Sequence, residues 1–581
     1  MSKFLKKIFI LCLFLFFVVS SQAYARGISK NGVISESCYK INEIYPSKFE
    51  INTTNSFPGY RGPNQLIVYK PAWGLRTGTN EFGKEAVVVN GIVVQLTGAD
   101  SIIPKNGYVI SGHGNAKVWL NKNIKIGTRV EINEKNNTIK ATTTVDSYEF
   151  NAEAKIKEVE AIIKKSNEQN LVFNEKKVRE YLREAKKYLR KGRFGNDKSA
   201  LSNLNHSIKA SSNALKYTLP YVSGELHGVW IRPTEKTRDE IVATLDNLSA
   251  VGINTIFLET YFHGKTIFPS KTMEKYGFNK LNPIFGDTDI LAIYIKEAHK
   301  RNIKVNIWFE SFYIGNVAPS SDLKNILSVK PHWGNKNKIN ADSKEPTWHP
   351  TEHRGYFLDP ANPEVISFLQ ELIEEISARY AIDGFNIDYI RYPQAQRPNE
   401  QGYEMSNWGY TQVARDEFKE IYGVDPIEVS YKTPLWRMWD EYRQNKITDY
   451  IKSVSEILEN REVLLSAVIF PDEDMSKSAK QQNWSKWSEL GYVNALTPLI
   501  LTSDDELAKK MMREVKRKSN GIAVYPGAFV GFMEGEPEDL LRQIRSMREL
   551  DLGGIILFDY AHLDKKYMDY LQSCVFSAVC E

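Results

Sequence analysis

From Gly224 onward, short runs of apolar residues alternate with stretches in which apolar residues recur every three or four positions. The first pattern predicts buried β-strands and the second predicts amphipathic helices. The apolar runs number eight: HGVWI, INTIFLE, IKVNIWFE, GFNIDYI, VLLSAVIF, VNALTPLI, GIAVYP and GGIILFDY. Eight strands that are each followed by helix are the count and order of a (β/α)8 barrel. We therefore predict an α/β fold of the TIM-barrel type over residues 222–581.

A doubly wound open sheet is the alternative fold for such an alternation of strands and helices. Sheets of that class commonly carry a glycine-rich phosphate-binding loop directly after the first strand. Neither a G-x-G-x-x-G pattern nor a phosphate loop follows HGVWI in this chain. The barrel is therefore the preferred prediction.

The residues ahead of the barrel show two other patterns. Between residues 26 and 150 the signals are those of β structure, and EAVVVNGIVVQL places apolar runs on both sides of Asn90-Gly91, a typical hairpin turn. The stretch NGYVISGHGNAKVWL adds further β signal. We predict a small β-rich domain for residues 26–150.

Residues 151–221 are rich in charge and have helical periodicity. Val178, Leu182, Ala185 and Leu189 fall on one stripe of a helix, and another stripe follows Asp197, the expected helix cap. We predict a helical connector whose apolar stripes pack together. Its many basic residues are interpreted as a solvated helix face, rather than as a contact with an anionic polymer.

The first 25 residues have the three parts of an export signal. Three lysines come first, an unbroken apolar run from Ile8 to Val19 follows, and Ala23-Tyr24-Ala25 is a typical cleavage site. The apolar run is shorter than the roughly 20 residues that a membrane-spanning helix needs. We predict a signal peptide over residues 1–25, a secreted or cell-surface protein, and no membrane span after signal removal.

Net charge and cysteine content narrow the range of partners. Removing the signal peptide would lower the formal charge from +5 to +2, which argues against a nucleic-acid partner. Cys38, Cys574 and Cys580 would remain in the mature chain. In an oxidising compartment Cys574 and Cys580 could form a disulfide, and three unpaired thiols are the open alternative.

Polar residues stand at the carboxyl ends of the predicted barrel strands, where the loops of a TIM barrel converge on one mouth. In strand order they are Arg232, Glu259, Glu310, Asp388, Asp472 with Glu473, Tyr525 and Asp559. A glycoside hydrolase needs two carboxyl groups that flank the bond to be cleaved. Aromatic side chains nearby would supply flat faces on which sugar rings stack. The pattern therefore favours a glycoside hydrolase.

Asp388 is the strongest single candidate. Acids at strand ends often cap the next helix or pair with a basic residue. For any one acid taken alone, this structural interpretation has the same weight as the catalytic one. Asp388, however, follows GFNI so closely that its strand must be buried, and Tyr389, Arg391 and Tyr392 stand next to it to tune the carboxyl group. Asp383 precedes the strand at the opposite rim, where a role in a turn is expected.

Five segments of the barrel region together resemble the bacterial family 10-like glycosyl hydrolases, once called domain of unknown function 187. They are HGVWIRP, the region GFNKLNPIFGDTDILAIYIKEAHKRNIKVNIWFESF, the region from YFLDPANPEV to DGFNIDYIRYP, SAVIFPDEDMSKSAKQQNWSKWSELGYVNALTPLI and GIILFDYAHL. The resemblance implies a secreted or surface enzyme that acts on bacterial glycans, which in some members of the family include peptidoglycan strands. It places Asp388 at the family's fourth-strand acid. Ahead of the barrel, YVISGHGNAKVWL resembles a phosphodiester-glycosidase-like module.

Three positions depart from the pattern of that family. Asn306 and Glu310 stand where relatives often have His and Asn, and Glu259 stands where Gln is frequent. The departures at Asn306 and Glu310 support a second hypothesis, in which the chain is a non-catalytic glycan-binding cell-wall protein on a barrel scaffold.

Our working assignment makes Asp388 the nucleophile or principal acid, Glu310 its partner, and Glu259 or Asp559 the reserve. Trp333 and Trp348 belong to a long loop, residues 331–356, that we expect to roof the cleft. The candidate substrate-binding residues are Arg232, Tyr261, Trp308, Asn386, Arg391, Tyr392, Trp333, Trp348 and Tyr525. The expected partner is a polysaccharide or the glycan strand of peptidoglycan.

The segment HPTEH, from His349 to His353, matches the H-x-x-E-H zinc pattern. That pattern needs a helix to bring both imidazoles to one side, whereas Pro350, Gly355 and the surrounding polar residues indicate a loop. We therefore predict no metal site and no cofactor.

Overall fold

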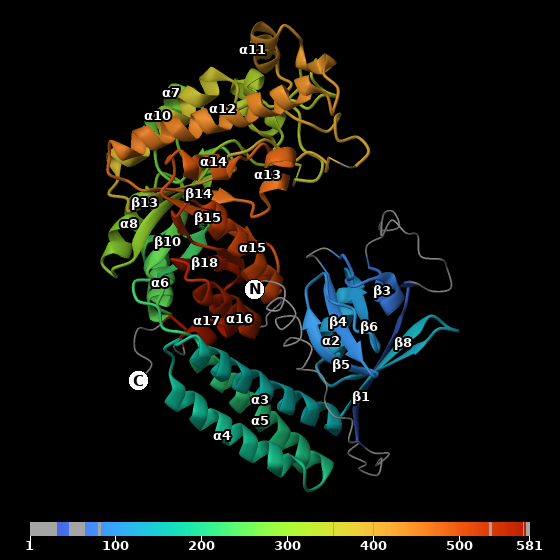
Figure 1. Ribbon diagram of the computed structural model, residues 1–581. Helices are drawn as coiled ribbons and strands as arrows, with labels where there is room; N and C mark the ends of the chain where they lie inside the picture. Colours follow the sequence, from blue (N-terminus) through green and yellow to red (C-terminus); the bar gives the residue numbers. More distant parts are fainter. Residues whose placement is uncertain are drawn as a thin grey trace, which may run out of the picture.

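A computed structural model describes residues 32–45, 64–79, 83–352, 354–398, 400–533, 537–572 and 575–576. Figure 1 shows a β-rich domain in blue, three helices beneath in teal, and the barrel from green to red. The predicted signal peptide, Cys574 and Cys580 lie outside the described residues, whereas Cys38 is exposed on a strand of the β-rich domain and forms no disulfide with a described residue. Within the described ranges, every helix is too short or too polar to cross a bilayer.

The N-terminal domain is an eight-stranded sheet in the order β1-β8-β7-β5-β4-β6-β3-β2. Asn90 and Gly91 both have positive φ and join β4 to β5, as the turn signature predicted. The prediction for NAKVWL was wrong, because these residues form most of helix α2, whose Ala116, Trp119 and Leu120 face the sheet at helical spacing. The strands are β1 (Val33–Lys40), β2 (Glu43–Tyr45), β3 (Leu66–Tyr69), β4 (Lys84–Val89), β5 (Ile92–Thr97), β6 (Gly107–Gly112), β7 (Arg129–Asn133) and β8 (Thr138–Thr144), and α2 is Asn115–Asn123.

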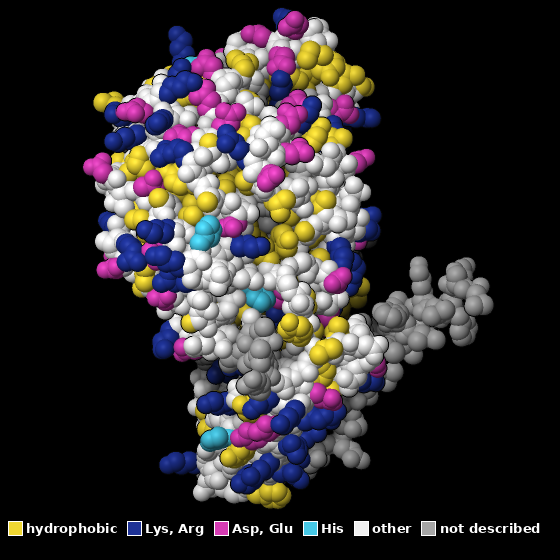
Figure 2. All heavy atoms as spheres, turned by 90° about the vertical axis from the view of Figure 1, so that its left-hand side faces the viewer, with side chains coloured by type: hydrophobic (Ala, Val, Ile, Leu, Met, Phe, Trp, Pro, Cys, Tyr) yellow, Lys and Arg dark blue, Asp and Glu magenta, His cyan; other side chains and the backbone are white. Residues whose placement is uncertain are grey.

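Three helices connect this sheet to the barrel: α3 (Val145–Glu168), α4 (Glu175–Gly192) and α5 (Asp197–Tyr217). The predicted stripe of α4 is buried between its neighbours. The cap of α5 is Asn196, whose side chain accepts a hydrogen bond from the Ser199 amide at 2.9 Å, so Asp197 is the first helical residue instead. Exposed Lys and Arg side chains gather on the lower part of the molecule in Figure 2, where these helices lie.

Eight parallel strands form a closed barrel, which confirms the predicted fold class. They are β9 (Leu226–Ile231), β10 (Thr255–Phe262), β12 (Lys304–Glu310), β13 (Gly384–Asp388), β14 (Leu465–Ile469), β15 (Ala495–Ile500), the pair β16 (Ala523–Val524) and β17 (Gly527–Phe529), and β18 (Gly554–Phe558). The barrel closes because β9 pairs with both β10 and β18. The seventh strand is split at Tyr525-Pro526, and both of its parts pair with β15.

A helix follows each barrel strand, and α6, α8, α15 and α16 are among the helices seen around the barrel in Figure 1. Thr237 caps the first of these helices through a capping box, and Asn362 with Pro363 begins the third. The helices are α6 (Arg238–Ala250), α8 (Ile290–His299), α10 (Pro363–Arg379), α12 (Pro434–Glu459), α14 (Trp484–Glu489), α15 (Asp505–Lys518), α16 (Pro537–Glu549) and α17 (Lys565–Leu571). Helix α3 lies along α16, where Glu158 pairs with Arg542 at 2.8 Å and Lys165 with Glu549 at 2.8 Å.

Side chains alternate between the two faces of the barrel strands. Residues such as Leu258, Ile307 and Ile387 pack against the helices. The lumen is filled by a separate cluster that contains Trp230, Phe257, Trp308, Val468 and Ile556. Because the period of a strand is two, Arg232, Glu259, Glu310 and Asp388 share the inward orientation at the carboxyl ends.

Two long loops enlarge the carboxyl end of the barrel. One runs from Ser311 to Asn362 between β12 and α10, and the other contains α11 (Gln412–Tyr422) and lies between β13 and α12. The second loop has an aromatic core of its own with the start of α12, which includes Tyr403, Tyr410, Phe418, Trp436 and Trp439. The mouth is therefore flanked by ordered structure.

Candidate active site

Four neighbouring strands deliver one basic and three acidic side chains to the barrel mouth. Arg232 follows β9, Glu259 lies near the end of β10, and Glu310 and Asp388 end β12 and β13. Glu310 and Asp388 are direct register partners in the parallel ladder. The structure thus brings together residues that are far apart in the sequence. In the layer below, for example, Trp230 binds Asn386, which lies 156 positions later in the chain.

Arg232 and Glu259 form a two-pronged ion pair. Arg232 Nη2 donates to Glu259 Oε1 at 2.8 Å, and its Nε donates to the other carboxylate oxygen. The nearest oxygen of Glu310 is 3.9 Å from Arg232 Nη2, beyond hydrogen-bonding distance. The second Glu310 oxygen accepts a hydrogen bond from the His263 amide at 2.9 Å.

Glu259 and Glu310 are completely buried, with side chains 0% and 1% exposed. Burial raises the pKa of Glu259 to about 7, although Arg232 opposes this shift. Burial, the charge of Glu259 and that of Asp388 hold the pKa of Glu310 well above its ordinary value. Both carboxyl groups are therefore shifted toward the protonated form, and Glu259 is the one with a hydrogen-bonded cation.

Asp388 differs because it is only half-buried. One carboxylate oxygen accepts from the Trp308 indole Nε1 at 3.0 Å, and the other accepts from the Tyr389 amide at 2.6 Å. Burial raises the pKa of Asp388, while these two donors and nearby Arg391 and Arg232 counteract that effect. The donors fix the orientation of a carboxyl group that remains open to the mouth.

The backbone of Tyr389 helps to orient Asp388. Tyr389 has a φ of 48°, an unusual conformation for an aromatic residue, in which its amide points back at the Asp388 side chain. Its ring is held between Tyr313, stacked at 4.6 Å, and the Arg391 guanidinium at 4.9 Å. Aromatic packing thus fixes the turn that orients the acid.

Asn386 supports the barrel interior, and the prediction that it binds substrate needs correction. Its side chain is fully buried, accepts from Trp230 Nε1 at 3.1 Å, and donates to Ser466 and Thr497 at 2.9 and 3.0 Å. Its side-chain oxygen and nitrogen both bind side chains of other strands. Trp308 is also buried, and its indole nitrogen donates to Asp388, so it orients that acid instead of offering a face to the mouth.

Three further aromatic candidates lie in the core rather than in a cleft. A register shift in β10 between Glu259 and Tyr261 turns Tyr261 away from the lumen, and its ring stacks on Phe309 at 4.8 Å. Trp333 is buried and donates its indole N–H to Glu364 at 3.0 Å. Tyr392 is 1% exposed. All three pack inside the protein and offer no face to the open mouth.

Tyr525 lies at the opposite end of the barrel from the acids. Its ring packs against Gly553, the residue before β18, where the Cβ of any larger residue would lie 2.7 Å from Tyr525 Cε1. Since β18 begins there, this is the amino end of the barrel. The prediction that Tyr525 binds substrate at the mouth therefore needs correction.

Asp559 follows β18 and accepts a hydrogen bond from His562 Nδ1 at 2.6 Å. Its side chain is 9% exposed, and the partner that the structure gives it is His562 rather than another acid.

Trp348 lies in the long loop after β12 and is 46% exposed, with the Arg354 guanidinium 5.9 Å from its ring. Trp348 is therefore the predicted aromatic contact that remains accessible.

Arg391 has a partner that the sequence did not reveal. Its guanidinium donates to both oxygens of Glu352, at 3.2 and 2.8 Å, and both side chains are largely buried. Glu352 also accepts from the Gln394 amide at 2.6 Å. Arg391 and nearby Lys480 lower the pKa of Glu352 to about 2. The pair joins the long β12 loop to the turn after Asp388.

Within the HPTEH segment, Pro350, Thr351 and Glu352 form a turn. His349 Nδ1 accepts from the Glu352 amide at 2.9 Å, and His349 Nε2 is 2.6 Å from the Gln394 carbonyl oxygen, to which it donates. Both ring nitrogens are therefore used within the protein, and His353 lies outside the described residues. Across the parts of the chain that the structure describes, His, Cys, Asp and Glu residues form no group of three or more suited to a metal ion.

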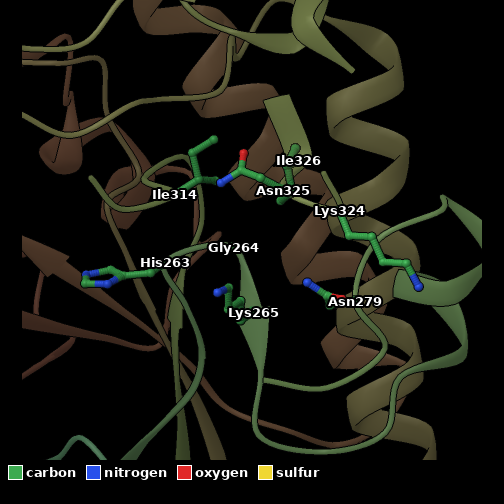
Figure 3. Close-up of a pocket in the computed structure, with 8 residues that line it drawn as sticks. All are labelled: His263, Gly264, Lys265, Asn279, Ile314, Lys324, Asn325 and Ile326. Atoms are coloured by element: carbon green, nitrogen blue, oxygen red, sulfur yellow. The ribbon is translucent and has the colours of Figure 1, made fainter. Parts of the chain in front are cut away.

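A small pocket lies beside the mouth, between the loops that follow β10 and β12 (Figure 3). It touches the acid cluster through His263, whose amide binds Glu310. Its lining is His263, Gly264, Lys265, Asn279, Ile314, Lys324, Asn325 and Ile326. No carboxyl group lines it, so it is a neighbour of the acid cluster rather than its reaction centre.

Comparisons with known proteins agree with a glycosidase-like role. The chain is 29% identical over 173 residues to glycosyl hydrolase DigH of Escherichia coli K12, which covers 28% of this chain and 37% of that relative. It is 23% identical over 392 residues to glycosyl hydrolase YngK of Bacillus subtilis, covering 59% of this chain and 69% of YngK. The chain thus spans just over a third of the length of the first relative.

Among solved structures, the catalytic domain of a β-amylase from Paenibacillus polymyxa matches with a TM-score of 0.42 and 11% identity, covering 61% of this chain and 99% of that domain. The family model described as glycosyl hydrolase-like 10 matches residues 223–535, more than half of the chain and most of the barrel. The chain therefore belongs to the glycosyl hydrolase-like 10 family.

Proposed function

We propose that this protein is a secreted glycoside hydrolase that cleaves bonds of a bacterial cell-wall or extracellular polysaccharide, with Asp388 and Glu310 as its paired carboxyl groups. The observation that carries this proposal is the position of Asp388. Its half-buried carboxylate is oriented by two hydrogen-bond donors and has Glu310 as its register partner on the next strand. Glycoside hydrolysis needs two carboxyl groups with different environments.

The different environments suggest different roles. Glu310, which holds its proton tightly, gives it to the glycosidic oxygen as that oxygen leaves with the electron pair of the broken bond. Asp388, oriented by Trp308 and Tyr389, supplies the negative charge that the anomeric carbon needs. A water molecule then gives its hydroxyl group to the anomeric carbon, and its proton restores Glu310. One water is consumed for each bond cleaved.

The proposed substrate follows from the export signal and from the family. The signal peptide predicted for residues 1–25 would bring the barrel outside the cell, where polysaccharides and peptidoglycan strands are found. The relatives DigH and YngK are both named as glycosyl hydrolases. The exposed ring of Trp348, in a loop at the mouth, offers a surface on which a sugar ring can stack.

A non-catalytic glycan-binding protein is the second candidate, and one observation favours it. Glu259 and Glu310 both lie buried beneath Arg232, so that Asp388 is the most open acid of the three. A binding protein could retain such a cluster for barrel stability alone.

Incubation with purified glycan strands separates the two candidates. We expect new reducing ends to accumulate in proportion to enzyme and time. Cosedimentation of the protein with the strands, without any release of ends over a range of bacterial wall and capsular glycans, would contradict the hydrolase and support the binding protein.

A further inference from the structure

The cluster of Arg232, Glu259 and Glu310 holds two buried carboxyl groups beneath one cation whose side chain reaches solvent. The glutamate side chains are 0% and 1% exposed. Arg232 directs two N–H groups at Glu259, and its closest approach to Glu310 is 3.9 Å. The hydrogen bonds of the cation toward this cluster therefore go to Glu259.

This arrangement limits the number of negative charges that the cluster can hold. A buried carboxylate without a paired cation is strongly unfavourable, and two neighbouring carboxylates cannot both ionise readily. Glu259 has the cation, so it is the group that ionises first. Glu310 accepts a hydrogen bond from the uncharged His263 amide, which does not balance a negative charge.

The groups that face Glu310 from the surrounding elements agree with this order. Asp388 adds a second negative charge from β13, and the phenols near it are neutral at ordinary pH. Arg232 is the one cation that acts on Glu310 among the principal influences within the described residues. Those that the structure describes are Arg232 after β9, Glu259 and Tyr261 from β10, the His263 amide, Tyr313 from the loop after β12, and Asp388 and Tyr389 from the end of β13.

We propose that Arg232 directs ionisation to Glu259, and that Glu259 is the positioning residue whose charge keeps a proton on Glu310 at neutral pH, so that Glu310 stands ready as the general acid. Glu259 is then the group of the pair that ionises first and neutralises Arg232, rather than a reserve catalytic acid. The catalytic consequence rests on the hydrolase function proposed above, whereas the location of the proton does not.

Two substitutions have opposite expected effects on Glu310. In Glu259→Gln the neighbouring negative charge is lost and Arg232 becomes free to face Glu310, so the pKa of Glu310 falls, by about 1–3 pH units. In Arg232→Gln the opposing cation is lost, so the pKa of Glu310 rises. A general loss of structure would not lower the pKa of Glu310 in one variant and raise it in the other.

Carbon-13 NMR of protein labelled at the glutamate side-chain carboxyl carbons measures this titration directly. The signal absent from Glu310→Gln identifies the group. We expect it to stay in the protonated range through neutral pH in the parent, and to titrate at lower pH in Glu259→Gln. An ordinary glutamate titration in the parent, or an unchanged or raised midpoint in Glu259→Gln, would overturn the proposal.

Two features keep this test decisive. The parent protein alone reports whether Glu310 holds its proton, so a variant that fails to fold does not remove the test. The NMR experiment also needs no substrate. A parent that releases no glycan ends but holds the proton on Glu310 would contradict the hydrolase function and leave this inference standing. A parent that releases glycan ends but shows an ordinary titration of Glu310 would overturn this inference and leave the hydrolase function standing.

Discussion

The indole N–H of Trp308 lies 3.0 Å from a carboxylate oxygen of Asp388, and the two residues belong to neighbouring strands of the barrel. Trp308 is also part of the aromatic cluster that fills the lumen. One side chain thus packs the interior of the barrel and orients the acid at its mouth.

Trp308→Phe should keep the packing of the lumen and remove the hydrogen-bond donor. A hydrogen bond to a charged group contributes about 1.5–3 kcal/mol, so kcat/KM should fall roughly 10- to 100-fold. The bond stabilises ionised Asp388, so its loss raises the pKa of that group and moves the acidic limb of the pH–rate profile to higher pH. Trp230→Phe is the matched control, because its indole binds neutral Asn386. Similar shifts of the acidic limb in both variants would argue against the role given to Trp308.

Asn386→Ala should destabilise the protein, because the substitution leaves three buried polar groups on other strands without their partner. Each such group costs about 1–3 kcal/mol, and partial relaxation makes a total loss of about 2–5 kcal/mol the expected result. Urea denaturation followed by circular dichroism measures it. Asn167→Ala, at an exposed position of α3, is the control and should change stability little. A fully stable Asn386→Ala protein with weakened glycan binding would instead return Asn386 to the substrate site.

Glu352→Gln should remove an acid-sensitive part of the stability. The pKa of Glu352 is lowered to about 2 in the folded protein, so its contribution is complete above its unfolded value near pH 4.5 and is lost as the pH falls toward 2. The lowering corresponds to a contribution on the order of 3 kcal/mol at neutral pH. Denaturation of parent and variant from pH 7 down to pH 2.5 should show a gap in unfolding free energy that narrows below pH 4.5. A gap that is constant with pH would contradict the pairing of Glu352 with Arg391.

Trp348 and Trp333 should respond differently to substitution by alanine. Trp348 is 46% exposed, so Trp348→Ala should leave the melting temperature almost unchanged and raise KM for a glycan, by about 3- to 10-fold for one lost stacking contact. Trp333 is fully buried, so Trp333→Ala should cost about 3–5 kcal/mol of stability. Thermal melts and initial rates on the same preparations check both. An unchanged KM in Trp348→Ala would remove that residue from the substrate site.

The barrel could be predicted from the sequence because strands buried on both faces are read as short apolar runs. All eight predicted runs coincide with barrel strands, and the helix stripes between them are buried as expected. The failure at NAKVWL has a physical reason: six residues with apolar positions at Ala116, Trp119 and Leu120 fit a helical period, but the segment is too short to outweigh the β pattern around it.

The site could be predicted only in part. Strand ends identify which acids can reach the mouth, and this argument found Glu259, Glu310 and Asp388. It could not foresee the register shift that turns Tyr261 outward, because a local irregularity in a strand changes the face of the residues after it. The pairing of Arg391 with Glu352, 39 positions away, depends on how a long loop folds and left no periodic signal in the sequence.

The sequence also did not show which aromatic side chains are buried. Tyr392 and Trp333 have the composition expected of a sugar-binding surface, yet both lie in the core, where large aromatic rings bury the most apolar area. Many aromatic residues near the mouth of a barrel therefore indicate a packed core as much as a surface that binds sugars.

The most direct test of the account is the release of reducing ends from purified glycan strands by the parent, by Asp388→Asn and by a matched control. Asp551→Asn is that control, because Asp551 is 99% exposed, lies at the amino end of the barrel and has a positive φ that asparagine also adopts. The account predicts that Asp388→Asn loses at least about 1,000-fold in rate at a near-parental melting temperature, while Asp551→Asn keeps the parental rate. An Asp388→Asn protein that still cleaves glycan at a comparable rate would contradict the central claim.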